Sequence, residues 1–198
     1  MATDLARIVR ELASFYDVTD KKLVVVGAGG EQLLEFARPA RQVLAVDKDG
    51  AALEQLAARL QDCGFADKFT LVTSDVADVS EPGDVVYLEF CLHEMPDPDR
   101  ALDHVRSLAP DVVVIDHAVG SPWSWCAAED RMVETAWRAV ERRTIRRQHT
   151  VEGEQRFPDD AALAARLVSQ GPLSVERIGA YRGRAPIVIP MPYRLALL

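Results

Sequence analysis

Apolar residues follow two different periods along the chain. Residues 4–15 carry apolar side chains at the spacing of one helix face, which predicts an amphipathic N-terminal helix within residues 1–20. Beyond it, short Val, Ile and Leu runs at 23–26, 42–46, 69–72, 84–90 and 112–115 alternate with helical patterns. Such runs are typical of parallel strands with both faces covered by helices. We therefore predict a doubly wound α/β fold.

The C-terminal third continues this alternation less regularly. Its pattern predicts helices over 123–145 and 159–169, followed by strands at Val175–Tyr181 and Ile187–Leu197. Pro190 and Pro192 prevent the last strand from donating a full hydrogen-bond ladder, so an irregular or edge position is expected. No linker or repeat interrupts the sequence, and we expect one domain over residues 1–198, with 118–160 as an acceptor-site or lid segment.

Composition excludes several classes of protein. The 198 residues are 48% hydrophobic and 27% charged, which is unlike disordered, collagen-like or coiled-coil chains. Three scattered cysteines without a CxxC pair argue against a disulfide framework and against a structural zinc site, so no metal is expected. The N-terminus lacks a signal-peptide pattern and no run of eighteen apolar residues occurs, which favours a soluble cytoplasmic protein without a membrane partner.

A net charge of −8 disfavours broad binding to nucleic acid. Six arginines nevertheless gather between positions 131 and 147. At about 100° per residue, one helix face carries Arg131, Arg138, Arg142 and Arg146, as expected of a solvated surface. Arg143 and Arg147 would project from the apolar side if the helix continued. Either the helix ends near Glu141, or these two reach inward to an anionic substrate, which suits a planar guanidinium.

A glycine turn and two acids follow the first strands. Gly27 and Gly29 let the backbone turn sharply and let a ligand approach closely. Asp47 ends the second strand, 20 residues after Gly27 (47 − 27 = 20), where a carboxylate can accept hydrogen bonds from ribose hydroxyls. Asp75 follows the third strand and could accept from an adenine amino group. The carboxyl ends of parallel strands are the usual ligand site, so these residues predict nucleoside-cofactor binding there.

From Lys22 onward the chain resembles the class I S-adenosylmethionine-dependent methyltransferases. The segment Phe90–Pro98 is similar to the stretch after the fourth strand in their small-molecule branch, which includes the quinone methyltransferases. The resemblance implies a Rossmann-like, seven-stranded, mainly parallel sheet whose last strand inserts antiparallel. It also implies S-adenosyl-L-methionine as cofactor, with Gly27, Ala28 and Gly29 at its methionine part, Asp47 with Lys48 at the ribose end, Asp75 and Val76 at the adenine, and Phe90 beside the sulfonium.

Two positions depart from that family pattern. An acid often stands two residues before the first glycine, and a third glycine two residues after the second; here these positions hold Val25 and Glu31. The ammonium of the cofactor therefore lacks its usual carboxylate on the first strand. Backbone carbonyls or Glu31 are the candidate substitutes.

Groups for proton transfer and for the acceptor follow the fourth and fifth strands. A nucleophilic oxygen or nitrogen loses a proton on methylation, and His93 is the favoured base, with His117 next; packing or capping is the structural alternative for both. Acceptor contacts are expected from the opening helix and from the segment after the fifth strand. The candidates are Tyr16, Glu94, Trp123, Arg143 and Arg147. Trp123, Trp125 and Trp137 form either an aromatic pocket wall or the core of a lid helix.

These features predict methyl transfer from S-adenosylmethionine to a small-molecule acceptor, at an O, N or C nucleophile, with an anionic or aromatic acceptor as one option. An NAD-dependent oxidoreductase is the enzymatic alternative, but Gln32 replaces the third glycine of the dinucleotide fingerprint and no Tyr-x-x-x-Lys pair occurs. A non-catalytic S-adenosylmethionine-binding protein is a further alternative, and a nucleic-acid methyltransferase is disfavoured by charge. The sequence does not fix the oligomeric state.

Overall fold

A seven-stranded sheet forms the centre of the protein in the computed structural model, which describes residues 5–29 and 32–198. The strand order is β3-β2-β1-β4-β5-β9-β6. The strands β1 (Lys22–Val26), β2 (Gln42–Asp47), β3 (Phe69–Thr73), β4 (Val85–Glu89) and β5 (Asp111–His117) are parallel. β9 (Tyr193–Leu197) runs antiparallel between β5 and β6 (Arg147–Val151). This sheet confirms the predicted Rossmann-like, mainly parallel fold.

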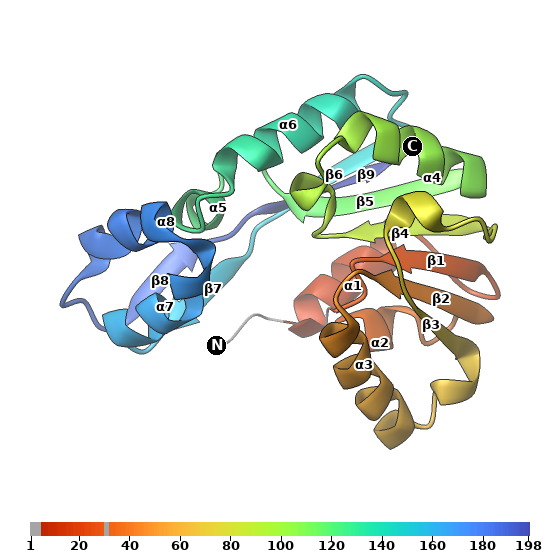
Figure 1. Ribbon diagram of the computed structural model, residues 1–198, viewed down its shortest axis with the longest axis horizontal. Helices are drawn as coiled ribbons and strands as arrows, with labels where there is room; N and C mark the ends of the chain where they lie inside the picture. The colour runs from red at the N-terminus through yellow and green to blue at the C-terminus, as the bar shows by residue number, and fades with distance from the viewer. Residues whose placement is uncertain (1–4, 30–31) are drawn as a thin grey trace.

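Helices cover both faces of the sheet (Figure 1). On one face, α1 (Leu5–Phe15), α2 (Gln32–Phe36) and α3 (Gly50–Cys63) pack in a core that includes Leu23 and Val25 of β1. On the other, α4 (Pro98–Leu108) and α6 (Asp130–Glu141) pack in a core that includes Val24 and Val26. Successive residues of β1 therefore enter different cores, which explains why this central strand is apolar at nearly every position.

The C-terminal third differs from the sequence prediction. The sixth strand of the sheet is Arg147–Val151, a largely exposed and polar segment, whereas the predicted strand Val175–Tyr181 is wrong. Those residues lie in α8 (Pro172–Arg177) and a short 3-10 helix (Ile178–Tyr181). The predicted strand Ile187–Leu197 is divided at Met191 and Pro192 into β8 (Ile187–Pro190) and β9, which belong to different sheets.

A small unit with its own apolar core lies beyond the carboxyl end of β5 and the amino end of β9 (Figure 1). It contains the two-stranded sheet of β7 (Glu154–Phe157) and β8, together with α5 (Pro122–Cys126), α7 (Asp160–Leu167) and α8. The predicted helix over 123–145 is two helices, α5 and α6. The segment 118–160 thus contributes to the small unit, to a helix on the main sheet and to the edge strand β6.

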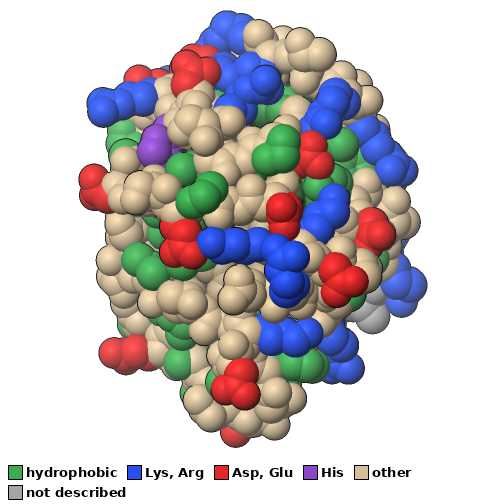
Figure 2. All heavy atoms as spheres, turned by 90° about the vertical axis from the view of Figure 1, so that its right-hand side faces the viewer, with side chains coloured by type: hydrophobic (Ala, Val, Ile, Leu, Met, Phe, Trp, Pro, Cys, Tyr) green, Lys and Arg blue, Asp and Glu red, His purple; other side chains and the backbone are tan. Residues whose placement is uncertain are grey.

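The opposite end of the sheet carries mixed charge. Figure 2 shows Lys and Arg side chains interspersed with Asp and Glu on the face where the parallel strands begin. Ion pairs at this end include Lys22–Glu81 at 2.6 Å, Arg41–Asp84 at 3.4 Å and Arg146–Asp111 at 2.6 Å. The Lys22, Arg41 and Arg146 side chains at this end are thus paired with carboxylates. Among the described residues, no helix is long and apolar enough to cross a membrane. Cys63, Cys91 and Cys126 are free.

Candidate active site

A cavity of about 870 Å³ opens at the carboxyl ends of β1, β2 and β4. The sequence prediction placed a ligand at this edge, and seven of its eight candidate cofactor residues line the cavity: Gly27, Gly29, Asp47, Lys48, Asp75, Val76 and Phe90. The eighth, Ala28, is fully buried in the core with α1, α2 and α3 and does not line it. The tertiary structure therefore brings together residues that are up to 63 positions apart (90 − 27 = 63).

The turn after β1 has room for backbone only. Gly27 has a φ of +79°, and a Cβ on it would lie 2.5 Å from the carbonyl oxygen of Glu89 and 2.8 Å from Cβ of Cys91. Because β1 and β4 are neighbours, the end of β4 presses directly against this turn. A residue without Cβ lets the chain bend here and leaves a shallow cradle for a ligand.

The two acids stand at separate places on the cavity wall. Asp47 ends β2, and its Oδ1 accepts from the backbone N–H of Asp49 at 2.9 Å, which holds the carboxylate in position. Asp75 caps a short 3-10 helix by accepting from the N–H of Ala77 at 2.9 Å. Each carboxylate has a second oxygen with which it can accept a hydrogen bond from a ligand. Both carboxylates line the same cavity, where they can accept hydrogen bonds from a nucleoside.

Phe90 occupies a strained position at the end of β4. Its φ is +46°, in the left-handed region that costs a non-glycine residue about 1 kcal/mol or more. Its ring lines the cavity and packs against His117 at 5.2 Å and Tyr193 at 6.0 Å between ring centres. The packing against β5 and β9 holds the strained backbone in place. The ring thus forms a fixed apolar wall next to the glycine turn.

Glu89 is a cavity residue that the sequence analysis missed. It ends β4, is 3% exposed, and its Oε1 accepts a hydrogen bond from Nε2 of Gln32. Burial raises the pKa of its carboxyl to about 8, opposed by the Gln32 hydrogen bond and reinforced by the charge of Asp47. The signal in the sequence that could have identified Glu89 is a single carboxylate at the end of an otherwise apolar strand. Glu31, the candidate named from the sequence, lies outside the described residues.

Two buried histidines adjoin this wall without lining the cavity. His93 and His117 are 4% and 7% exposed, and their ring centres lie 5.6 Å apart. Nδ1 of His93 lies 2.6 Å from Oδ1 of Asp116. Burial by itself would lower the pKa of His93, but the hydrogen bond and charge of Asp116 outweigh it and raise the pKa. Burial lowers the pKa of His117 to about 4, so this imidazole is neutral at pH 7.

Lys48, Glu94 and Arg166 complete the cavity toward solvent. Lys48 Nζ and Glu94 Oε2 lie 3.8 Å apart, which joins the loop after β2 to the loop after β4 across the intervening strand β1. Arg166 projects from α7 of the small unit and lines the same cavity. It was absent from the sequence prediction because α7 reaches the cavity only through the tertiary arrangement.

The structure does not bring the other substrate candidates to this edge. The Tyr16 hydroxyl donates to Asp111, the first residue of β5, at the opposite end of the sheet. Arg147 begins β6 at that same end and donates to the carbonyl of Phe15. Trp123 stacks on Phe157 with ring centres 5.9 Å apart, inside the core of the small unit. The contacts of Trp123 and Arg147 are therefore with other parts of the protein, as the structural alternatives for these residues expected.

Arg143 is likewise engaged by the protein itself. The helix α6 ends at Glu141, and Arg143 turns back to Asp99 and Asp103 of α4, at 2.6 and 2.7 Å. Its side chain is 12% exposed. We expect Arg143→Ala to lower the free energy of unfolding by about 2 kcal/mol, because two carboxylates lose a shared and largely buried partner. Affinity for S-adenosylhomocysteine should stay unchanged in calorimetry. Arg131→Ala, at an exposed position of α6, is the control and should alter neither quantity.

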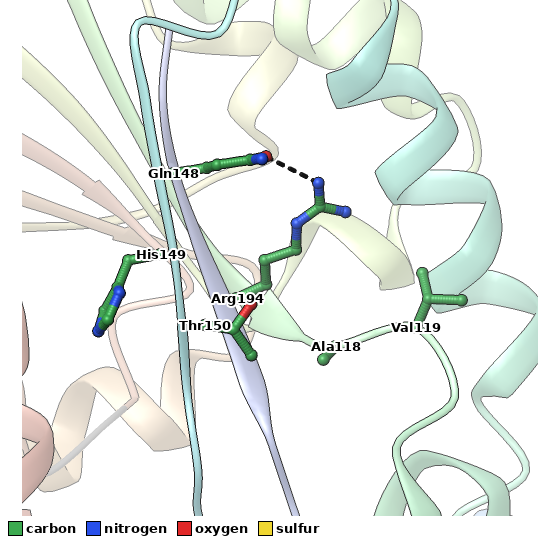
Figure 3. Close-up of a pocket in the computed structure, with 6 residues that line it drawn as sticks. All are labelled: Ala118, Val119, Gln148, His149, Thr150 and Arg194. Carbon is green, nitrogen blue, oxygen red and sulfur yellow. Dashed lines mark hydrogen bonds between the residues drawn. The ribbon is translucent and has the colours of Figure 1, made fainter.

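A second hollow of about 580 Å³ lies beside β6 and β9 (Figure 3). Its cation is already engaged, since Arg194 donates to Gln148 at 2.8 Å and to Glu141 at 2.9 Å. Figure 3 shows His149 pointing away from Arg194 on the other side of the strands, and this histidine pairs with Glu11 at 3.4 Å. The hollow lacks the glycine turn and the carboxylates of the first cavity, which remains the candidate active site.

Known proteins share this architecture. Residues 24–115 match the family model described as a methyltransferase domain. A candidate methyltransferase from Bacillus halodurans is 14% identical with a TM-score of 0.68, covering 98% of this chain and 97% of its own. The N-methyltransferase NodS from Bradyrhizobium japonicum, solved with S-adenosylhomocysteine, is 13% identical with a TM-score of 0.60, covering 98% and 83%.

A candidate RNA methyltransferase from Pyrococcus horikoshii is 18% identical with a TM-score of 0.57, covering 97% of this chain and 83% of its own. No curated protein sequence matches the chain. The structural likenesses establish the fold, and the family match covers strands β1 to β5, which carry the cavity. Residues 24–115 therefore form a methyltransferase domain, for which S-adenosylmethionine is the cofactor, and the remaining strands complete the same sheet.

Proposed function

We propose that the enzyme methylates a small-molecule acceptor held in the same cavity as the cofactor. The observation that carries this proposal is the continuity of the cavity from the glycine turn and Asp47, past Phe90, to Glu94, Met95 and Arg166. One open cavity thus offers separate walls to the donor and to the acceptor. A pocket of several hundred cubic ångströms is the usual size of a small-molecule site.

Charge around the cavity supports a small acceptor over a polynucleotide. Asp47, Asp49, Asp75, Glu94 and Asp97 all line it, and the whole chain carries a net charge of −8. A phosphate polymer would meet these carboxylates at close range. Arg166 is the cation that reaches the cavity from the small unit, and we propose that it pairs with an anionic group of the acceptor, in the role first assigned to Arg143 and Arg147.

The residues of this chain contribute mainly alignment and exclusion of water. Bound S-adenosylmethionine supplies a sulfonium methyl group for in-line displacement, a reaction whose leaving group needs no further activation. We propose that Asp47 orients the ribose, that Asp75 and Val76 hold the adenine, and that Phe90 closes the apolar side. The glycine turn would support the methionine part. Of the groups that line the cavity, Glu94 follows β4 directly after Phe90, and we propose it as the proton acceptor.

We propose that His117 acts through Phe90 as a positioning residue. Its ring centre lies 5.2 Å from that of Phe90 and 5.6 Å from that of His93, and its backbone N–H donates to Oδ1 of Asp116. His93, expected from the sequence to be the base, already shares Nδ1 with Asp116, and its raised pKa favours the charged form, which cannot accept a proton. His117, whose imidazole is neutral at pH 7, packs directly on Phe90 and is the one of the two that we propose for this positioning role.

A buried neutral histidine makes stability depend on pH. The pKa of His117 is about 4 in the folded protein, so its contribution is present above the unfolded value of about 6.5 and is lost as pH falls toward 4. We expect the free energy of unfolding to lose about 2 kcal/mol between pH 7 and pH 5 from this residue. Urea titrations of the native chain and of His117→Asn would measure it. An equal pH dependence in both proteins would contradict the neutral buried imidazole.

The function is tested by following the methyl group. Isotopically labelled S-adenosylmethionine is incubated with the enzyme and with cell extract divided into small molecules, RNA and protein. We expect label in the small-molecule fraction, and Arg166→Gln should raise the acceptor KM while S-adenosylhomocysteine binds as before. Asp47→Ala serves as the inactive control. Label in RNA or protein would overturn the proposed acceptor class, and label in none would favour a non-catalytic binding protein.

A further inference from the structure

A buried carboxylate stands where the first strand offers none. Val25, two residues before Gly27, is fully buried in the apolar core against α1, α2 and α3. Its partner on the neighbouring strand is Tyr87 of β4, and Glu89 follows two residues later on the same face of the sheet. Glu89 is thus displaced by one strand and toward the carboxyl edge, and its backbone carbonyl lies against the glycine turn.

One oxygen of this carboxylate is left without a partner. Oε1 of Glu89 accepts from Gln32, but Oε2 is buried and has no hydrogen-bond partner among residues 5–29 and 32–198. A buried carboxylate oxygen without a hydrogen-bond partner costs free energy. In a native protein such an oxygen is therefore expected to bind a ligand or to carry a proton. Glu89, Gln32 and Gly27 all line the cavity, which places this oxygen at the end where the methionine part would lie.

We propose that Glu89 binds the α-ammonium group of S-adenosylmethionine, replacing the carboxylate that the first strand lacks. This inference rests on the cofactor assignment and adds a residue to it. Gln32 holds Oε1 and directs Oε2 toward the ligand. A charge-assisted hydrogen bond in a water-poor site gives both affinity and orientation to the methionine end. The adenosine end, at Asp47 and Asp75, is held independently.

The free enzyme satisfies the same oxygen with a proton. Since the pKa of Glu89 is about 8, the carboxyl is neutral at pH 7 without ligand. An arriving ammonium stabilises the carboxylate, so binding releases this proton. The groups facing Glu89 are Asp47 of β2 and, on its own strand and loop, Tyr87 and Cys91. Burial raises the pKa of both Tyr87 and Cys91, so these two keep their protons in this pH range.

Two ligands separate the ammonium contact from the rest of the site. S-adenosylhomocysteine carries the amino-acid part, whereas 5′-methylthioadenosine ends at the thioether. In calorimetry at pH 7, Glu89→Gln should weaken S-adenosylhomocysteine by roughly tenfold to hundredfold, the value of one hydrogen bond to a charged group. Its affinity for methylthioadenosine should change less than about twofold. Titrations in two buffers of different ionisation enthalpy should find proton release only for the native enzyme with S-adenosylhomocysteine.

Matched variants make the outcome decisive. Glu35→Gln removes an exposed carboxylate of α2 that pairs with Arg38 and should change neither affinity. Glu31→Gln tests the competing residue: a selective loss of S-adenosylhomocysteine there, with none at Glu89, overturns the proposal. Equal weakening of both ligands by Glu89→Gln also overturns it. If that variant does not fold, the native enzyme decides, since affinity for S-adenosylhomocysteine alone should rise from pH 6 to pH 8. Failure of both ligands to bind native enzyme would instead refute the cofactor.

Discussion

Replacing Gly27 by alanine is expected to abolish cofactor binding and to destabilise the fold. The new Cβ would lie 2.5 Å from the carbonyl oxygen of Glu89, a backbone atom that cannot move without displacing β4. The φ of +79° adds strain that glycine does not feel. We expect a loss of about 3 kcal/mol in the free energy of unfolding and no detectable binding of S-adenosylhomocysteine by calorimetry.

Gly64→Ala is the matched control for this change. Gly64 has a similar φ of +72° at the C-terminal end of α3, but a Cβ there would meet no atom within 4 Å. It should cost only the backbone strain, about 1 kcal/mol, and leave ligand affinity intact. The difference between the two variants isolates the contact with β4. Equal stability and undiminished binding in Gly27→Ala would show that the turn does not form the cradle.

The second large effect is expected at Asp47. Its carboxylate is held at the end of β2 by the N–H of Asp49 and lines the cavity, where it can accept from both ribose hydroxyls. Loss of two hydrogen bonds to a charged group costs about 3 kcal/mol or more, so Asp47→Ala should raise the Kd of S-adenosylhomocysteine by at least about a hundredfold. Calorimetry measures this change directly. Methylthioadenosine, which keeps the ribose, should weaken in parallel.

Asp49→Asn controls for the charge of the loop. Asp49 also lines the cavity, and its Oδ1 caps α3 by accepting from the N–H of Ala51 at 2.9 Å, which asparagine can retain. This variant should bind S-adenosylhomocysteine within about threefold of the native enzyme. A comparable loss in both variants would mean that general negative charge, and not a ribose contact, governs binding. Tight NAD binding by the native enzyme would contradict the cofactor itself.

The strands found from the sequence are those with both faces buried. β1 and β4 are buried at nearly every position, so their apolar runs stand out from the surrounding sequence. β6 has four exposed residues of five, and its Arg-Gln-His-Thr-Val run resembles a loop. It forms a strand because the backbone of β9 offers hydrogen bonds along its whole length. Strand pairing of this kind depends on a partner 46 residues away (His149 and Leu195) and leaves no apolar period in the sequence.

The error at Val175–Tyr181 has the opposite cause. Its apolar residues suggested a buried strand, but a proline at the start of α8 and the small core of the second unit favour a helix there. Val175 remains 48% exposed. Short apolar segments fit either structure, and their neighbours in space decide between them.

The sequence by itself determined the parallel sheet, the glycine turn and the positions of Asp47 and Asp75, because each depends on residues within one strand and the loop that follows it. Only the tertiary structure decided which charged groups reach the cavity. Glu89 and Arg166 enter it from β4 and from α7, while Tyr16, Arg143 and Arg147 are bound elsewhere by other parts of the chain. The physical reason is that a charged side chain has many possible partners, and the fold alone selects one.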